Sequence, residues 1–338
     1  MKNYSVLLLF LLLSGSISTP LFLGSGMIAR FPAAAQAPVL VVTPVADAAP
    51  VPIVAPSPQI ERVLIVSFDG MRTDAIEAAP MNNLIQLMGN SAYNLTTAIT
   101  IAYPVTLPSH AAMLSGMCMD KNGIYLNKYF KYMGYSQGTD IFDLAHAAGL
   151  RTVMEVGKDK LRQIAEPETT DVFEVQYEES LIGEAAVEQI SQGFGLMFVH
   201  FPSADEVGHK YGWMGGSYLL MLRNGDEAFG KMLAALDANG LLDTTLIIVT
   251  ADHGGHDSNH TGFLIEDYRI PWVASGPGIV PGEITARIHT MDTAATVAYA
   301  LGFPQPEEWD GIPVYEAFGE PRLKIHPESV QWPCHQWN

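Results

Sequence analysis

The sequence is poor in cysteine, in basic residues and in charged residues of either sign. Its 338 residues include two cysteines, Cys118 and Cys334, too few for a disulfide framework or a cysteine-rich zinc finger. Export would allow the two to pair, but two free or partly buried thiols fit the pattern equally well. Only 18 basic residues face 36 acidic ones, a net charge of −18, so we expect no nucleic-acid-binding surface.

The N-terminal segment, residues 1–36, has few charges and one long apolar run. Lys2 precedes the run Val6–Leu13, and the next charge is Arg30. This pattern is typical of an export signal peptide, although the uncharged span is also long enough for an N-terminal membrane anchor. We therefore expect an exported protein, periplasmic or extracellular, with an uncleaved membrane tether as the alternative.

The next segment, residues 37–59, is rich in proline, alanine and valine. Such a composition predicts an extended linker. The folded domain should therefore occupy residues 60–338, and the hydrophobic content of 48% is enough for a substantial core.

From Arg62 onward, short β-branched apolar runs alternate with amphipathic stretches, and there is no internal repeat. This alternation predicts an α/β sandwich with a mostly parallel central sheet and helices on both faces. The expected strands cover residues 63–68, 152–156, 195–201, 245–250 and 270–274. The expected helices cover residues 109–115, 141–148, 183–192, 218–238 and 291–300.

Three carboxylates follow three of the expected strands. Asp69 comes directly after the first strand, Asp205 follows "FVHF", and Asp252 follows "IIVT". Open α/β sheets bind their ligands at the carboxyl ends of their strands. One aspartate at such a turn could be a simple cap. Three together indicate a binding site at this edge.

Histidines accompany two of these carboxylates. Asp205 and His209 are four residues apart, which places both side chains on one face of a helical turn. Three of the ten histidines fall between residues 250 and 260, where Asp252 and His253 are adjacent and glycines permit an irregular loop. Carboxylate and imidazole together suit zinc. Exposed surface histidines are the alternative.

Thr106, in "YPVTLPSH", is either a helix cap or a nucleophile. Pro108 suits the first turn of a helix, so Thr106 should lie at a helix N-terminus, which attracts phosphate or sulfate. An unaided threonine hydroxyl is a weak nucleophile, but metal coordination could hold it as the alkoxide.

Five motifs occur in the order and spacing of a known superfamily. They are "VSFDGMRTD", "TLPSH", "DEVGH", "ADHGG" and "NHTGFLIEDYRIPWVASGPGI". Over roughly residues 61–311 the chain resembles the alkaline phosphatase superfamily, and within it the type I phosphodiesterase and nucleotide pyrophosphatase branch. The resemblance implies an alkaline-phosphatase-like three-layer sandwich.

The resemblance also implies two zinc ions per chain. Asp205, His209 and His260 would bind one ion. Asp69, Asp252 and His253 would bind the other, with Thr106 as its activated ligand. His256 is a rival for the last ligand position, but the downstream "PWVASGPG" spacing favours His260.

The implied activity is hydrolysis of phosphodiester or pyrophosphate bonds in a small, nucleotide-type phosphate ester, through a phosphothreonine intermediate on Thr106. Ser109 and Asn127 are the expected substrate contacts, and no protein partner is inferred. The alternatives are a phosphomonoesterase, a sulfatase-like hydrolase and a non-catalytic zinc-binding protein.

Other polar and aromatic residues have more ordinary interpretations. We expect Lys158 and Lys160 in a solvated turn, and Arg72 paired with Asp74. The aromatic run 125–135 is expected to pack against the sheet, and a wall for an aryl or base group is the alternative.

Overall fold

The computed structural model describes residues 60–262, 264–321 and 334. The predicted export segment and linker, residues 1–59, lie outside the described residues. Within the described ranges, no helix combines the length and the apolar character needed to cross a bilayer.

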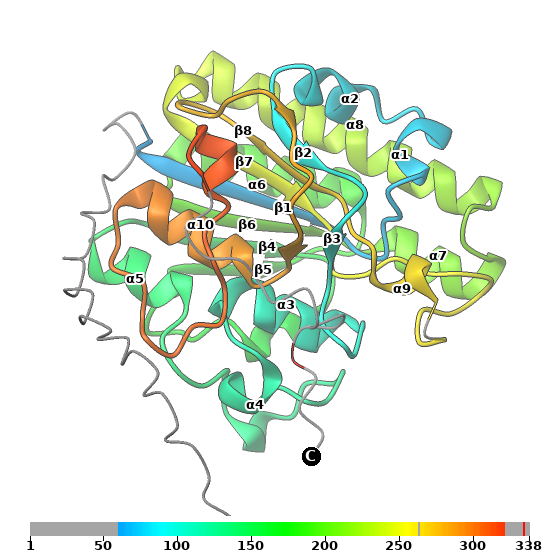
Figure 1. Cartoon of the computed structure of the whole chain (residues 1–338), viewed down its shortest axis with the longest axis horizontal. Coiled ribbons are helices and arrows are strands. Elements are labelled where there is room, and N and C mark those ends of the chain that lie inside the picture. Colours follow the sequence, from blue (N-terminus) through cyan, green and yellow to red (C-terminus); the bar gives the residue numbers. More distant parts are fainter. Residues whose placement is uncertain (1–59, 263, 322–333, 335–338) are drawn as a thin grey trace, which may run out of the picture. The chain divides into compact units, whose positions relative to one another are not determined.

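The core of the fold is an eight-stranded sheet in the order β5-β4-β6-β1-β7-β8-β2-β9 (Figure 1). Five neighbouring strands run parallel: β5 (Val172–Val175), β4 (Thr152–Val156), β6 (Leu196–Phe201), β1 (Arg62–Phe68) and β7 (Thr245–Thr250). The remaining strands are β8 (Trp272–Ser275), antiparallel to β7, then β2 (Ala92–Asn94) and β9 (Gly282–Glu283). A separate short pair joins β3 (Ala98–Ile99) and β10 (Ile288–His289).

The central strands are buried on both faces. Every residue of β6 and β7 is buried, as is every residue of β1 after Arg62. Strands covered on both sides read as continuous apolar runs rather than alternating ones, which is why "VLIVSF" and "LIIV" could be recognised in the sequence.

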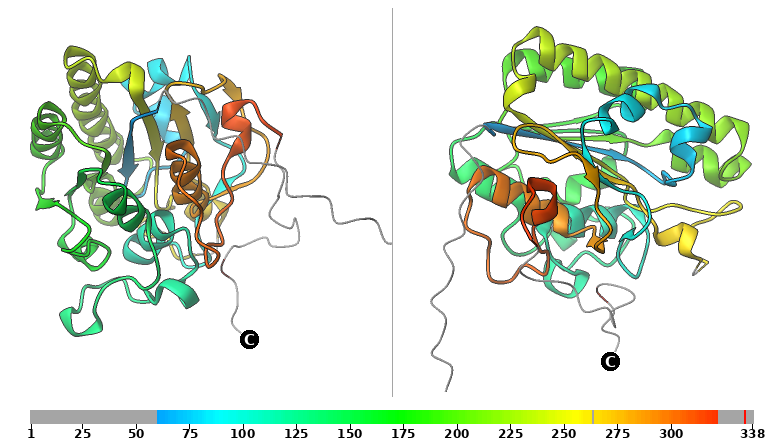
Figure 2. Two further views of the ribbon diagram at one scale, coloured as in Figure 1. Left: turned by 90° about the vertical axis from the view of Figure 1, so that its left-hand side faces the viewer. Right: turned by 45° about the horizontal axis from the view of Figure 1, so that its top comes forward.

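Helices cover both faces of the sheet (Figure 2). One layer contains α1 (Ala75–Ala78), α2 (Asn82–Met88), α6 (Glu179–Gln192) and α8 (Gly216–Ala238). The other contains α3 (Thr106–Ser115), α4 (Met119–Asn122), α5 (Ile141–Ala147) and α10 (Asp292–Leu301). Helix α8 packs on α6 and α2, and α10 packs on α3 and α5. The predicted three-layer sandwich with a mostly parallel sheet is therefore confirmed.

Shorter helices lie in the connections. They are α7 (Ser203–Tyr211), α9 (Ile265–Tyr268) and the 3₁₀ turns η1 (Lys131–Met133), η2 (Asp159–Gln163), η3 (Leu242–Thr244) and η4 (Tyr315–Phe318). Helix α7 follows β6 directly, so its first turn lies at the carboxyl edge of the sheet.

The two cysteines form a disulfide. Cys118 and Cys334 are joined with their Cα atoms 5.1 Å apart, across 216 positions of sequence. The sequence pattern left this pairing open, and the structure decides in favour of it. The bond ties the start of α4 to the C-terminal region.

Candidate active site

Three adjacent parallel strands bring the three predicted carboxylates together. Asp69 follows β1, Asp252 follows β7 by two residues, and Asp205 lies in the first turn of α7 after β6. Because β6, β1 and β7 are neighbours, their carboxyl ends meet at one edge. All three side chains are buried, with exposures of 0%, 0% and 5% respectively.

The first cluster comprises Asp69, Asp252 and His253. His253 Nε2 lies 3.4 Å from Asp69 Oδ1 and 3.3 Å from Asp252 Oδ2. A tetrahedral zinc ion with bonds of about 2.0–2.1 Å places its ligand atoms about 3.3 Å apart. These three atoms are buried and have no hydrogen-bond partner among the described residues. The cluster therefore fits a metal ion.

The second cluster comprises Asp205, His209 and His260. Asp205 Oδ1 lies 3.4 Å from His209 Nε2 and 3.7 Å from His260 Nε2, and the two Nε2 atoms are 3.1 Å apart. His209 Nδ1 donates to Ser258 O at 3.0 Å, and His260 Nδ1 donates to Pro104 O at 2.6 Å. These bonds leave both Nε2 atoms as lone-pair donors facing the carboxylate.

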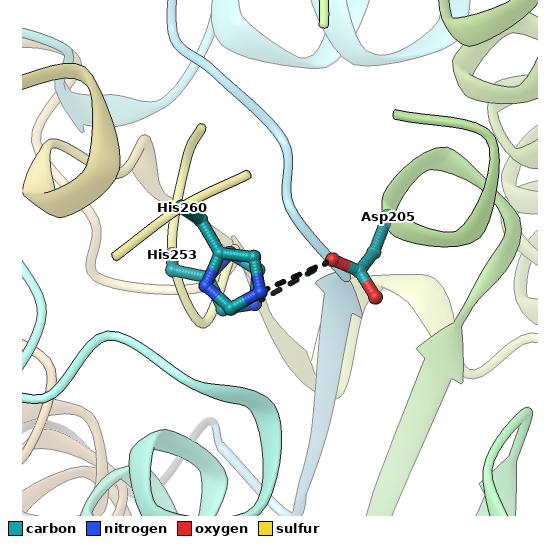
Figure 3. A group of neighbouring side chains, drawn as sticks. All are labelled: Asp205, His253 and His260. Carbon is teal, nitrogen blue, oxygen red and sulfur yellow. Dashed lines mark ion pairs between the residues drawn. The ribbon is translucent and has the colours of Figure 1, made fainter. Parts of the chain in front are cut away.

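The two clusters adjoin through His253. Its ring stacks on that of His260 with centroids 3.8 Å apart, and its Nε2 lies 3.9 Å from Asp205 Oδ1. Figure 3 shows both imidazole rings facing the Asp205 carboxylate. Six side chains predicted as ligands are thus brought together in two contiguous groups.

Burial and like charges act on these groups. Burial, reinforced by the nearby Asp69 charge, raises the pKa of Asp252 to about 7. Burial also opposes ionisation of Asp69, but Lys158 and the bond from His200 hold the pKa of its carboxyl well below the usual range. Burial, together with the His253 ring, lowers the pKa of His260 to about 3. A divalent ion would relieve the repulsion between the carboxylates.

Lys158 corrects the expectation of a solvated turn. Its ammonium lies 2.7 Å from Asp69 Oδ2 and 2.5 Å from Asp205 Oδ2, and its side chain is 12% exposed. The oxygens that it contacts are not the ones that face the predicted ligand histidines, although Asp69 Oδ2 also lies 2.9 Å from His200 Nε2. Lys158 therefore links one carboxylate of each cluster from the opposite side. Sequence reasoning missed this role, because a lysine after a strand carries no local sign of its partners.

Lys160 is also held within the site region rather than in solvent. Its ammonium donates to Asn127 Oδ1 at 2.9 Å, and the same oxygen accepts the backbone N–H of Leu107 at 3.0 Å. Burial, followed by repulsion from Lys158, lowers the pKa of Lys160. A cation thus lies beside the N-terminus of α3.

Thr106 is the first residue of α3 and is 1% exposed. His110 Nδ1 donates to Thr106 O at 2.8 Å and lies 3.6 Å from Asp252 Oδ2 in the first cluster. Pro104, two residues earlier, accepts the bond from His260 in the second cluster. Both contacts hold the segment that carries Thr106 against the two clusters, at a helix N-terminus as predicted.

The two predicted substrate contacts have different surroundings. The Asn127 side chain lies beside the start of α3, because its Oδ1 accepts bonds from the Leu107 N–H and the Lys160 ammonium. Ser109 is fully buried, and its Oγ accepts a bond from Thr100 Oγ1 at 3.2 Å, close to β3. Both contacts stay predictions, and the geometry supports Asn127 better.

His256, the rival for the last ligand position, and Arg72 have other partners. His256 Nδ1 lies 2.6 Å from Asp267 Oδ1, so its ring is oriented by that carboxylate, whereas His260 lies in the second cluster. Arg72 pairs with Asp74 at 2.7 Å, as expected from the sequence. The choice of His260 over His256 agrees with this geometry.

The aromatic run 125–135 does not pack into the core, contrary to expectation. Tyr125 is 44% exposed and Tyr132 is 83% exposed. Asn127, which lies within this run, is the residue that contacts the N-terminus of α3.

Comparison with known proteins agrees with this geometry. The chain matches the family model for type I phosphodiesterase / nucleotide pyrophosphatase over residues 63–270. It is 23% identical over 216 residues to a bis(5'-adenosyl)-triphosphatase of Xenopus laevis, covering 57% of this chain and 47% of the relative. It is 31% identical over 128 residues to a multifunctional alkaline phosphatase superfamily protein of Trinickia caryophylli, covering 34% of this chain and 25% of the relative. The chain thus spans less than half the length of these curated relatives.

Solved structures show the same fold. A 2-O GAG sulfatase is similar with a TM-score of 0.64 at 17% identity, over 79% of this chain and 76% of that chain. Murine ectonucleotide pyrophosphatase / phosphodiesterase 5 is similar with a TM-score of 0.60 at 15% identity, over 72% of this chain and 96% of that chain. The sandwich is therefore alkaline-phosphatase-like.

Proposed function

Because the chain belongs to the type I phosphodiesterase / nucleotide pyrophosphatase family of the alkaline phosphatase superfamily, we propose that it hydrolyses phosphodiester or pyrophosphate bonds in small phosphate esters. One observation carries the proposal. Two contiguous carboxylate and imidazole clusters lie against the segment that carries Thr106, and four of their facing atoms lack a hydrogen-bond partner among the described residues.

The donor set favours zinc, since each cluster combines carboxylate with neutral imidazole. Asp205, His209 and His260 would hold one ion, and Asp69, Asp252 and His253 the other. When bound, the ions would make the Thr106 hydroxyl a better nucleophile and offset negative charge on the phosphoryl oxygens.

The charge of the site changes sign with metal binding. Three carboxylates and Lys158 give −3 + 1 = −2 without metal. Two divalent ions add 4, which leaves +2. An anionic substrate would therefore be repelled by the metal-free site and attracted by the loaded one.

The chain itself supplies the nucleophile and a phosphoryl site. The backbone N–H of Thr106, at the positive end of the α3 dipole, would bind a phosphoryl oxygen next to the Thr106 hydroxyl. Thr106 Oγ1 would lose its proton to solvent and form a bond to phosphorus while the bond to the leaving oxygen breaks, and that oxygen would depart with the electron pair and take up a proton from solvent. Water would then attack phosphorus, releasing phosphate or a phosphate monoester and regenerating the Thr106 hydroxyl.

Lys158 and Lys160 favour a second candidate, phosphomonoester hydrolysis. Both ammonium groups lie within the site region, one on the cluster carboxylates and one on Asn127. A phosphate monoester carries about −2 at neutral pH, whereas a diester carries one negative charge. Extra positive charge beside the helix N-terminus stabilises the dianion more strongly.

A substrate panel separates these functions. Hydrolysis of a bis-aryl phosphate, an aryl phosphate and an aryl sulfate is measured with zinc-loaded wild type, Thr106→Ala and the control Ser115→Ala at the other end of α3. A higher kcat/KM for the diester supports the first proposal, and a higher value for the monoester supports the second.

The same panel tests the nucleophile. Thr106→Ala should lower kcat at least about 10³-fold, because no other group in the proposal forms the bond to phosphorus. Ser115→Ala should retain activity. Full activity of Thr106→Ala would remove Thr106 from the mechanism, preference for the sulfate would favour a sulfatase-like hydrolase, and an inert wild type would leave a non-catalytic zinc-binding protein.

We also propose that the protein is exported, as the sequence of residues 1–36 suggests. The Cys118–Cys334 disulfide supports this, because such bonds persist in oxidising compartments. The mass of the mature protein, recovered separately from soluble and membrane fractions of exported material, distinguishes a cleaved signal from a retained anchor.

A further inference from the structure

Trp213, which follows α7, lies where the ligand-bearing segments meet. It is 7% exposed. Its ring packs edge-on against those of His209 and His260, with centroids 5.1 Å and 5.9 Å away. Its backbone N–H donates to Asp257 O at 2.7 Å, within the loop between the two predicted ligands His253 and His260. Trp213 is nevertheless no part of the proposed ligand set.

Three glycines border this indole. A Cβ added at Gly255 would lie 2.2 Å from a ring atom, one at Gly208 would lie 2.8 Å away, and one at Gly70 would lie 3.3 Å away. A real Cβ atom essentially never lies under about 3 Å from another heavy atom, since that distance is far inside van der Waals contact. Each glycine comes from a different motif, "FDG", "DEVGH" or "ADHGG", and each lies within two residues of a predicted ligand.

Gly70 connects the indole to the first cluster. Its carbonyl accepts bonds from Trp213 Nε1 at 2.9 Å and from Tyr218 OH at 3.0 Å. Its N–H donates to Asp252 Oδ1 at 3.0 Å, and its φ of +73° favours glycine. The indole therefore binds the carbonyl of Gly70, whose N–H in turn orients the Asp252 carboxylate.

We propose that Trp213 is a positioning residue that sets the spacing of the three ligand-bearing segments, and that the glycines at 208 and 255 serve to admit its ring. This inference rests on the proposed metal binding. Ligand atoms of a zinc ion must lie about 3.3 Å apart. Loss of the ring that separates the segments should therefore weaken binding, although no ligand is removed.

The first test compares zinc affinities by competition with a chromophoric chelator. Trp213→Leu should weaken binding about 10- to 100-fold, the range observed when groups supporting metal ligands are removed. Trp213→Phe, which keeps a ring but loses the bond to Gly70, should fall in between. Circular dichroism of the metal-free proteins shows whether each variant is folded.

Trp309 provides a matched control. It is 6% exposed, its Nε1 donates to Thr139 O at 2.7 Å, and it also packs on a glycine, Gly116. Trp309→Leu should lower stability to a similar degree as Trp213→Leu and leave zinc affinity unchanged. Equal losses of zinc affinity in both variants would show that Trp213 contributes only general packing, and would contradict the positioning role.

The second test uses the glycine in α7. Gly208→Ala should weaken zinc binding in the wild-type background, because the new methyl group would clash with the indole. In a Trp213→Leu background the same substitution should have no further effect, since alanine is otherwise favoured in a helix. Gly216→Ala, with open space around the added atom, is the control.

The outcomes separate this inference from the proposed function. A wild type that binds no zinc overturns both. If the wild type binds zinc, two results would overturn the positioning role alone. The first is a zinc affinity of Trp213→Leu within about threefold of wild type. The second is an equal loss of zinc affinity on Gly208→Ala substitution in both backgrounds.

Discussion

Replacement of Lys158 by methionine tests the charge balance of the site. The lysine forms an ion pair with one carboxylate of each cluster, with its ammonium between Asp69 Oδ2 and Asp205 Oδ2. Methionine keeps much of the side-chain volume and removes the charge. Without metal, Lys158→Met leaves two buried carboxylates without their shared counter-ion.

The expected magnitude depends on metal. Removing one partner of a buried ion pair costs about 3–5 kcal/mol, because the remaining charge is uncompensated. In a domain of this size, that loss lowers the melting temperature by about 6–10 °C. With zinc bound, the ions would compensate both carboxylates through their other oxygens. The loss should then fall to about 1–2 kcal/mol, the net value of the hydrogen bonds.

The assay is thermal unfolding with and without zinc, for wild type, Lys158→Met and the exposed control Lys231→Met. Zinc should raise the melting temperature of Lys158→Met by several degrees more than that of wild type. Lys231→Met should behave as wild type. An equal loss of stability in both metal states, or no loss in either, would refute the reasoning that Lys158 and the metals share the same carboxylates.

Three further predictions concern other parts of the chain. Thr106→Ala should keep the zinc content and melting temperature of wild type, because three other protein ligands remain at each ion, while losing hydrolysis, as measured by metal analysis, calorimetry and turnover. Burial, reinforced by the neighbouring Glu174, raises the pKa of Glu155 to about 7, so the folded state holds this proton more tightly than the unfolded chain. Stability should therefore fall by up to about 2 kcal/mol as pH rises from about 4.5 to 7, and urea titrations of Glu155→Gln should lack that loss. Cys118→Ser should lower the free energy of unfolding by about 2–5 kcal/mol, and a reductant should reproduce this in wild type but not in the variant.

Much of the fold could be predicted because the central strands are buried on both faces. The expected strands 152–156 and 245–250 coincide with β4 and β7. The short strands β2 and β9 were not predicted, since two or three residues carry no periodic pattern. The antiparallel direction of β8 could not be predicted from the sequence either, because an apolar run does not show whether a strand runs parallel or antiparallel to its neighbour.

The start of α3 was expected later than it occurs. The helix begins at Thr106, whereas the amphipathic pattern suggested residue 109. Residue periodicity is uninformative here because all ten residues of the helix are buried. The notion that Thr106 lies at the helix mouth was nevertheless correct, since Pro108 marks a first turn.

The grouping of the six predicted ligand residues could be anticipated because each residue lies in a short motif, and because the carboxyl ends of parallel strands meet at one edge. Lys158 and Trp213 could not, since their partners come from several segments far apart in sequence. Their roles depend on how loops pack, which no local pattern records. The disulfide could not be predicted for the same reason, because its two cysteines are 216 positions apart.

The central claim is that two adjacent metal sites lie beside Thr106. Its most direct test is the zinc content per chain of purified, dialysed protein, for wild type, Asp205→Ala and Asp252→Ala. We expect two zinc ions in wild type and one in each variant, because each substitution removes a ligand from a different cluster. One ion or none in wild type would contradict it.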